Sequence, residues 1–572
     1  MSSSPLGRNT CTPTCYIDDR SVWDPVGARA VAAGTKGRQS SSLAVVLYLF
    51  MCGIAQPCFA QIFDAAALKS RLSALAQPES RKIGSIDLAG YDFLPKLYAA
   101  LNYQPVWTPA NVAALSQAVT RSWEDGLIPA DFHKDYVKAA LAGTAPGDAA
   151  DRELILSDAL VRLLYQLYFG KVAPNGLDTN WNFARPMLTE DPVTPIVAAL
   201  QAEKLADLFD RVTLKHPLYI ELKALLHQYT DYEARGGWPN VPEGPTLKPG
   251  QSDPRVALLR GRLAVTGEWQ RRPDADAAEI YDSSLVDAVK LFQTLHGLEP
   301  DGVVGAGTLA VLNVPVSTRI AQLRANLERG RWLLRTMGPE AVIVNVAGFY
   351  LHVFLNSKKV WTTRVIVGQS YTKTPIFTEA MKTVVLNPDW TVPQSIVRNE
   401  IFPKAAANPG YLAAGNYEVI DGSGKPVGAV DFAAYTAATF PYRIRQQPGP
   451  KNALGLVKFL FPNKHSVYLH DTPSRQLFDK AGRTFSHGCV RVEDPLKLAD
   501  IILGDRLGWT RAKIDGMLAT GKMQSIGLPK PLPVLVLYWT VDPSPENGTA
   551  FYADVYGRDA VLIKALNAPF KP

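Results

Sequence analysis

Residues 484–494 read TFSHGCVRVED, and the interpretation of the fold and of its chemistry starts from this stretch. It places His487, Cys489 and Arg491 within five positions. A cysteine in such surroundings is open to four interpretations: a nucleophile, a metal ligand, half of a disulfide, or a small apolar residue in a core. The remainder of the chain narrows these four.

The first sixty residues have the features of a secretory signal. Lys36 and Arg38 precede an apolar run at 43–54, and small residues follow near Ala60. This is the order of the charged region, apolar region and cleavage site of an export signal. The run is short for a membrane span, which needs about 20 residues. We expect residues 1–60 to be a leader and signal peptide or an uncleaved membrane anchor, with the protein in the periplasm or cell envelope.

Export changes how the cysteines are interpreted. Five are present, and four of them, Cys11, Cys15, Cys52 and Cys58, lie in the leader. The fifth, Cys489, then has no intramolecular partner for a disulfide. A structural zinc site usually needs four ligands, which a lone cysteine with histidine neighbours does not supply. An inert buried cysteine and a reactive thiol remain open.

The neighbouring residues favour the reactive thiol. Gly488 indicates a backbone with an unusual dihedral angle or a close approach. Upstream, residues 466–469 are predicted to form a short strand that ends at His470. Fifteen residues with several turn formers separate His470 from Ser486. Such a loop allows the imidazole to reach Cys489, and an imidazole in hydrogen-bond reach activates a thiol.

The stretch HDTPSRQLFDKAGRTFSHGCVRV resembles the signature of the L,D-transpeptidases, the YkuD-type catalytic domain. The family pattern is a histidine, a spacer and then Ser-His-Gly-Cys-x-Arg. Matching positions at that spacing are His470, Ser486, His487, Gly488, Cys489 and Arg491. Asp471 follows the histidine where many members carry glycine, although the larger YcbB-like branch carries aspartate there. The resemblance covers residues 340–525 and, more loosely, the chain after the leader.

The resemblance implies roles for these residues. Cys489 is expected to be the acyl-accepting nucleophile and His470 the general base that activates it. Backbone N–H groups around His487, Gly488 and Cys489 are expected to form the oxyanion hole. Ser486 and His487 are expected to orient the catalytic pair or the substrate.

Three further residues are assigned less narrowly. Arg491 either holds a substrate carboxylate or braces the loop through an ion pair, for example with Glu493. Trp390 and Tyr468 are assigned to the substrate cleft, although Trp390 is equally compatible with a core position. We expect no metal ligand, and the resemblance implies neither a metal nor an organic cofactor.

The segment around the motif is predicted to be mainly β. Runs rich in β-branched and aromatic residues at 341–346, 349–355 and 360–368 are separated by short turns and predict a meander. Another strand is expected within 381–396. Residues 398–450 interrupt the pattern with Gly, Ala, Pro and Tyr, and they resemble the capping insertion of YcbB-like members. We expect this insertion to form a lid over the cleft.

Flanking regions complete the prediction of a multidomain α+β protein. Residues 61–240 are expected to be a helical scaffold domain. Apolar spacing at 247–312 predicts three helices, and FQTLHGLEPDGVVGAGTL within it resembles a peptidoglycan-binding module. Residues 316–340 are expected to be a linking helix, 341–525 the catalytic domain, and 526–572 a C-terminal segment that packs on the scaffold.

The net charge of +7, without a run of five basic residues, does not indicate nucleic acid. The resemblance implies a peptidoglycan L,D-transpeptidase that forms 3→3 cross-links through a cysteine thioester and releases D-Ala. Its partners are expected to be peptidoglycan stem peptides and glycan strands, and its inhibitors β-lactams of the carbapenem type. The alternatives are an L,D-carboxypeptidase or protein-to-wall anchoring enzyme on the same fold, and a non-catalytic wall-binding scaffold.

Overall fold

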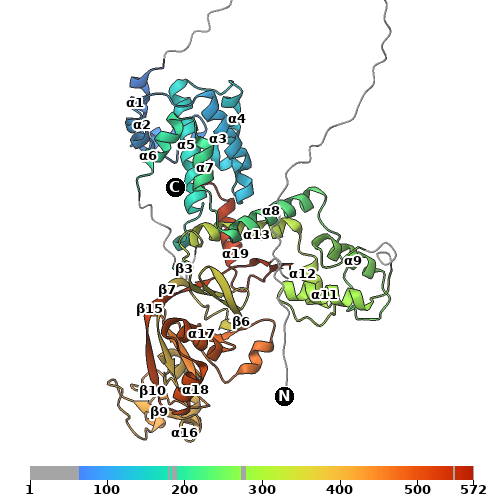
Figure 1. The fold of residues 1–572 in the computed structure, drawn as a ribbon, viewed down its shortest axis with the longest axis vertical. Helices are drawn as coiled ribbons and strands as arrows, with labels where there is room; N and C mark the ends of the chain where they lie inside the picture. The colour runs from blue at the N-terminus through green and yellow to red at the C-terminus, as the bar shows by residue number, and fades with distance from the viewer. Residues whose placement is uncertain (1–62, 178–180, 183–189, 272–277, 545–547, 571–572) are drawn as a thin grey trace, which may run out of the picture. The chain divides into compact units, whose positions relative to one another are not determined.

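The computed structural model describes residues 63–177, 181–182, 190–271, 278–544 and 548–570 (Figure 1). The predicted leader, with its apolar run, lies outside the described residues. In the described part of the chain, no helix is both long and apolar enough to cross a membrane. The architecture is multidomain α+β, as the sequence predicts.

An N-terminal helical region has a hydrophobic core of its own. Its long central helix begins at a capping box: the Asp148 carboxylate accepts the N–H of Asp151, and the Asp151 carboxylate accepts the N–H of Asp148. The elements of this region are α1 (Ala65–Ala74), the hairpin β1 (Lys82–Ile83) and β2 (Ile86–Asp87), α2 (Leu94–Ala100), α3 (Pro109–Arg121), α4 (Lys134–Leu141), α5 (Ala149–Phe169), α6 (Val193–Gln201) and α7 (Leu205–Val212).

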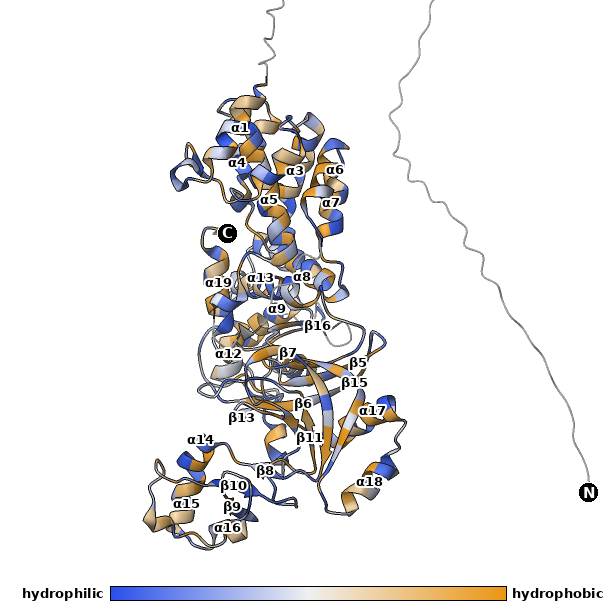
Figure 2. Cartoon of the chain, turned by 90° about the vertical axis from the view of Figure 1, so that its left-hand side faces the viewer, coloured by the Kyte–Doolittle hydropathy of each residue, from blue (hydrophilic) through white to orange (hydrophobic). Residues whose placement is uncertain are grey.

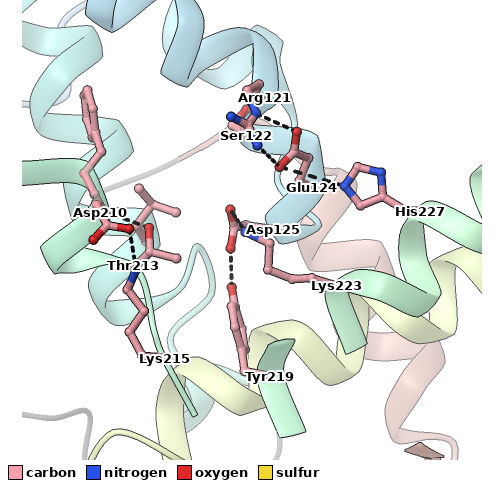
Figure 3. Close-up of polar contacts among 12 residues, drawn as sticks. Arg121, Ser122, Glu124, Asp125, Asp210, Thr213, Lys215, Tyr219, Lys223 and His227 are labelled. Carbon is pink, nitrogen blue, oxygen red and sulfur yellow. Dashed lines mark hydrogen bonds and ion pairs between the residues drawn. The ribbon is translucent and has the colours of Figure 1, made fainter. Parts of the chain in front are cut away.

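Two paired helices, α8 (Pro217–Ala234) and α13 (Val316–Leu333), add apolar side chains to the core of the catalytic sheet. Asp125 connects α8 to the helical region, because it accepts hydrogen bonds from the Tyr219 hydroxyl (3.0 Å) and from Lys223 Nζ (2.9 Å) (Figure 3). Helix α13, which the sequence predicts to be a linking helix, is largely buried. Its polar side chains join distant segments: the Asn326 carboxamide, for example, donates to Thr540 Oγ1 (2.8 Å).

A third region contains α9 (Arg255–Thr266), α11 (Ser283–Leu295) and α12 (Ala306–Leu312) around a separate core. His296 ends α11 as a structural residue: its Nδ1 contacts the Phe292 carbonyl (2.8 Å) and its ring stacks on Phe292 (3.9 Å between centroids). The same imidazole lies 6.2 Å from the Phe551 ring. The module is thus packed against the C-terminal hairpin β16 (Val541–Ser544) and β17 (Gly548–Phe551).

The catalytic domain is built on one sheet whose strand order is β11-β12-β14-β6-β5-β4-β15-β7-β3, with β13 paired to β6 and a further pairing of β11 with β7. Because β11 pairs with both β12 and β7, the pairings close into a circuit. Apolar strand residues, orange in Figure 2, fill its core. The strands are β3 (Trp181–Asn182), β4 (Ala341–Asn345), β5 (Tyr350–Leu355), β6 (Lys358–Gly368), β7 (Ile376–Leu386), β11 (Val457–Leu460), β12 (Leu469–His470), β13 (Thr484–Ser486), β14 (Val490–Val492) and β15 (Gln524–Leu537).

The sheet continues past residue 526, the predicted boundary between catalytic domain and C-terminal segment. Strand β15 crosses it and pairs in parallel with β4 and antiparallel with β7, so it lies inside the catalytic sheet. Figure 1 shows this as a red strand among yellow ones. Helices α17 (Pro495–Leu507) and α18 (Arg511–Ala519) precede β15. After β15, strand β16 and the last helix, α19 (Arg558–Asn567), both pack on α13.

The insertion after β7 forms a small subdomain, which we call the capping segment (residues 390–446). It has a separate apolar core and a three-stranded sheet in the order β8-β10-β9. It begins before the predicted residue 398, because β8 supplies its edge strand. Its elements are β8 (Trp390–Thr391), α14 (Gln394–Ile396), a π-helical turn (Val397–Ile401), α15 (Phe402–Ala407), α16 (Tyr411–Ala414), β9 (Tyr417–Ile420) and β10 (Arg443–Gln446).

Candidate active site

Strand pairing brings the predicted histidine and cysteine together. Strands β12 and β14 are parallel, with His470 in register with Arg491, and the Val490 N–H donates to the Tyr468 carbonyl (3.2 Å). Residues that are in register on adjacent strands lie on the same face of the sheet, so His470 shares a face with Arg491, and Tyr468 and Cys489 directly precede the two strands. All four line one cleft of about 1150 Å³.

The strand before His470 differs from the prediction. Residues 466–468 are not in a strand, and only Leu469–His470 pairs. The reason is an Asn463 turn, in which the Asn463 carboxamide oxygen accepts the N–H groups of His465 (3.0 Å) and Val467 (3.1 Å). Ser466 consequently has a positive φ of 54°, and its carbonyl lies 3.7 Å from the Cys489 sulfur as an acceptor for the thiol.

His470 is held in one tautomer. Its Nδ1 lies 2.5 Å from the Asp471 carbonyl, an acceptor, so Nδ1 carries the proton and Nε2 the lone pair. Burial, with a smaller contribution from the cations Arg491 and Lys458, lowers the pKa of His470 to about 3, although the hydrogen bond to the Asp471 carbonyl opposes the shift. Lys458 is the register partner of His470 on β11. The imidazole is therefore a neutral base at ordinary pH.

Cys489 is half-buried and carries a protonated thiol. Burial raises its pKa, and hydrogen bonds from Tyr468 and the charges of Lys458 and Arg491 oppose that rise. Lys458 Nζ also lies 4.0 Å from the centroid of the Tyr468 ring. A neutral thiol beside a neutral imidazole, rather than a preformed ion pair, is the resting state of the site.

The loop before the cysteine is fixed by Ser486. Its buried hydroxyl donates to the Cys489 carbonyl (2.5 Å) and accepts the Gly488 N–H (3.1 Å). Gly488 has a φ of 114°, which favours glycine. Since the Gly488 N–H is already engaged, the predicted oxyanion hole is corrected: the N–H groups of His487 and Cys489 remain as its candidate donors.

A second loop braces this one, and the sequence gives no signal for it. The Thr372 hydroxyl donates to the Ser486 carbonyl (3.1 Å), and the Thr374 hydroxyl donates to the Gly488 carbonyl (2.9 Å). Tyr556, from the C-terminal segment, donates to the Gly368 carbonyl (2.5 Å) at the start of that loop. The nucleophile loop thus depends on residues far away along the chain.

The ion pair suggested between Arg491 and Glu493 is wrong. Glu493 instead pairs with Arg364, whose Nε lies 2.7 Å from its carboxylate. Glu493 lies just after β14, and Arg364 on the neighbouring strand β6 reaches its carboxylate. In the described part of the chain no ion pair of Arg491 is recorded, and its guanidinium lines the cleft.

His487 contacts the capping segment across the cleft. Its Nε2 lies 2.6 Å from Glu400 Oε1 of the capping segment, and the two side chains are 41% and 39% exposed. The sequence analysis missed Glu400, because no local pattern connects it with the motif. Trp390 and Tyr468 line the cleft as predicted, and Tyr468 has a raised pKa because of burial and the neighbouring Cys489.

His352 lies outside the cleft. It is bonded to Thr362 on the next strand (2.9 Å), and burial lowers its pKa to about 4. Among the described residues, no group of three or more His, Cys, Asp or Glu side chains is arranged to hold a metal ion.

Comparisons with known protein families agree with this geometry. Residues 339–522 match the family model YkuD, described as "L,D-transpeptidase catalytic domain". Residues 92–226 match a "Scaffold domain", and residues 252–312 match a "Putative peptidoglycan binding domain". The sheet and its cleft are therefore a catalytic domain of the L,D-transpeptidase type, carried on a chain that also has a scaffold and a peptidoglycan-binding domain.

A curated relative is similar over part of its length. The Haemophilus influenzae protein named "Putative L,D-transpeptidase" is 36% identical over 221 residues, which are 38% of this chain and 44% of that protein. This chain thus spans less than half the length of the relative that it matches.

Two solved structures are also similar. A crystal structure of an L,D-transpeptidase from Xylanimonas cellulosilytica has 16% identity and a TM-score of 0.15, covering 52% of this chain and 99% of that one. A fused Zn-dependent amidase/peptidase/peptidoglycan-binding protein from Clostridium acetobutylicum has 14% identity and a TM-score of 0.12, covering 52% and 100%.

Proposed function

We propose that this protein is an exported peptidoglycan L,D-transpeptidase that forms 3→3 cross-links through a thioester on Cys489. The observation that carries the proposal is that a neutral His470, with its Nε2 lone pair, lines the same cleft as the Cys489 thiol, which directly precedes the strand paired with that of His470. That arrangement suits a thiol that is deprotonated as it attacks.

The acylation step uses both residues. The Cys489 sulfur attacks the carbonyl of the third stem residue while His470 takes the thiol proton. The bond to the terminal D-Ala then breaks, and His470 returns the proton to the departing amine, so that a thioester and free D-Ala result. The His487 and Cys489 N–H groups are the candidate donors to the oxyanion of the tetrahedral intermediate.

The second step transfers the acyl group. The neutral side-chain amine of a neighbouring stem attacks the thioester carbonyl, and the new C–N bond forms as the C–S bond breaks. The amine loses its proton to His470, which passes it to the sulfur, so the thiol is restored. No cofactor takes part in either step as written.

The cleft and the flanking domains support a polymeric, charged substrate. The Arg491 guanidinium in the cleft suits a stem-peptide carboxylate, and the peptidoglycan-binding domain suits the glycan strands. A carbapenem is expected to acylate Cys489 as the stem peptide does. Export would place the enzyme with its substrate in the periplasm or cell envelope.

The test is incubation of the full chain with a disaccharide-tetrapeptide, followed by mass spectrometry. A dimer that has lost one D-Ala supports the proposal. Tripeptide alone would indicate an L,D-carboxypeptidase. If the substrate is unchanged and no carbapenem adduct forms on Cys489, the result would favour a non-catalytic wall-binding scaffold.

A further inference from the structure

A carboxylate of the capping segment faces the nucleophile loop across the cleft. Glu400 Oε1 lies 2.6 Å from His487 Nε2, two residues before the nucleophile. In the described part of the chain, the other hydrogen bonds and ion pairs of residues 397–442 stay within residues 388–454. Glu400 is thus the polar bridge from the capping segment to the catalytic motif.

An irregular helical turn places this carboxylate. Residues Val397–Ile401 are π-helical and lie between α14 and α15. Such turns change the direction of side chains and are frequent at functional sites. Val397 and Ile401 enter the core of the capping segment, which leaves Glu400 half-exposed on the cleft wall.

Aromatic rings stand beside Glu400. Tyr411 and Tyr417 stack with 6.1 Å between centroids and line the same cleft. Burial, together with Tyr411 and Glu400, raises the pKa of Tyr417 to about 12. Lys404, whose Nζ is 5.9 Å from the Tyr411 centroid, lines the same cleft. A carboxylate with aromatic faces is a combination that recognises cations.

The opposite side of the cleft is cationic. Arg491 lies in the strand row that carries His470, and Lys458 is the next residue in that row. These charges already disfavour a proton on His470. They repel an incoming ammonium by the same interaction and favour carboxylates of the donor. Among the described residues that line the cleft, Glu400 is the acidic one, whereas Lys373, Lys404 and Arg491 are basic.

We propose that Glu400, backed by Tyr411 and Tyr417, is the subsite for the ammonium group of the acceptor stem. The acceptor then enters along the capping segment, and the donor lies on the Arg491 side. This inference rests on the proposed cross-linking function. Because Glu400 is half-exposed, solvent reaches the bound ammonium group, and the ammonium releases one proton to that solvent. The resulting neutral amine then attacks the thioester as described above.

The experiment measures acceptor use separately from acylation. The full chain is given a disaccharide-tetrapeptide donor at fixed concentration and a disaccharide-tripeptide acceptor at varied concentration, and dimer and hydrolysis product are quantified by mass spectrometry. The variants are Glu400→Gln, Glu400→Asp and the matched control Glu418→Gln. Glu418 lies in the same subdomain, but it pairs with Arg445 and is not part of the cleft lining.

For Glu400→Gln we expect the acceptor KM to rise about tenfold, since one charge-assisted contact is lost. The value of kcat should change less than about twofold, because the contact forms before the transition state. Added salt should raise the KM of the wild type and have little effect on that of Glu400→Gln. Glu400→Asp should recover part of the affinity, and Glu418→Gln should match the wild type.

Two results overturn the subsite. One is an unchanged acceptor KM in Glu400→Gln. The other is a fall in carbapenem acylation parallel to the loss of dimer, because Glu400 would then only hold the capping segment or the His487 loop in place. A wild type that yields tripeptide but no dimer overturns the cross-linking function itself, and the subsite with it.

Discussion

His470 and Arg491 are register partners across the parallel strands β12 and β14, so the base of the site stands next to a buried cation. Together with burial, this neighbour lowers the pKa of His470 to about 3. An imidazole with so low a pKa is a weak proton acceptor, but it remains unprotonated at ordinary pH. We therefore expect the unprotonated state of His470 to persist well into the acid range.

The first prediction concerns that pH range. His470 stays unprotonated well below its ordinary pKa of about 6.5, so the carbapenem acylation rate should not fall as the pH drops from about 7.5 to 5. Arg491→Met removes one cation, which raises the pKa of His470 and moves the acid limb to higher pH. The rates follow from intact-mass measurement at each pH. Lys497→Met, at an exposed site on α17, serves as the control, and a wild-type midpoint near 6.5 contradicts the prediction.

The second prediction separates two histidines of the sheet, the buried His470 and the half-buried His352. His470→Gln should slow acylation of Cys489 by about 10²–10⁴-fold, the usual contribution of a general base. His352→Gln should leave the rate within about twofold, because His352 contacts Thr362 and not the cleft. A comparable loss in both variants means that folding, and not proton transfer, explains the effect.

The third prediction tests the nucleophile. Cys489→Ala should give no covalent carbapenem adduct and no turnover, because residues 61–572 contain no other cysteine. Intact mass detects the adduct, and circular dichroism shows whether the fold is kept. Residual turnover in this variant would end the cysteine-enzyme proposal.

The fourth prediction concerns the loop. Ser486→Ala removes a donor from the Cys489 carbonyl and an acceptor from the Gly488 N–H, both in a buried position. Unsatisfied buried groups cost about 1–3 kcal/mol each, so acylation should slow and the unfolding temperature should fall. Ser525→Ala, an exposed position on β15, provides the comparison in the same thermal and kinetic assays. Equal rates in the two variants would show that Ser486 does not hold the loop.

The fifth prediction concerns the capping segment. Strands β8 and β10 are antiparallel partners, with Thr391 opposite Arg445, so residues 394–442 can be replaced by a short Gly/Ser linker between adjacent strand ends. Carbapenem acylation should persist. The ratio of tripeptide to dimer should rise, because the cleft is less protected from water and lacks Glu400. An unchanged ratio shows that the segment plays no part in the choice between amine and water.

The sequence predicts the meander well for a physical reason. Runs of β-branched and aromatic residues between short turns are a local property, and they locate β4, β5 and β6 at 341–345, 350–355 and 358–368. The motif likewise predicts that His470 and Cys489 come close together, and the parallel pairing of β12 with β14 places both residues in the lining of one cleft.

The errors come from long-range contacts. No local feature of the sequence predicts that strand β15 pairs with β4. Likewise, none predicts that the Tyr556 hydroxyl donates to the Gly368 carbonyl. Glu400 meets His487 only because the capping segment folds back over the cleft. The Arg491 pairing failed for a similar reason, since Arg364 on the adjacent strand is the partner of Glu493.

Strand β15 also determines how much of the chain must be synthesised before the cleft can fold. It completes the circuit of strands that holds Cys489, and Tyr556 braces the neighbouring loop, yet both leave the ribosome after the Ser-His-Gly-Cys motif. A nascent chain therefore carries its whole catalytic motif without a folded cleft. A premature stop codon between positions 490 and 556 should abolish activity as completely as loss of the cysteine, because the thiol would remain but the sheet that positions it would not form.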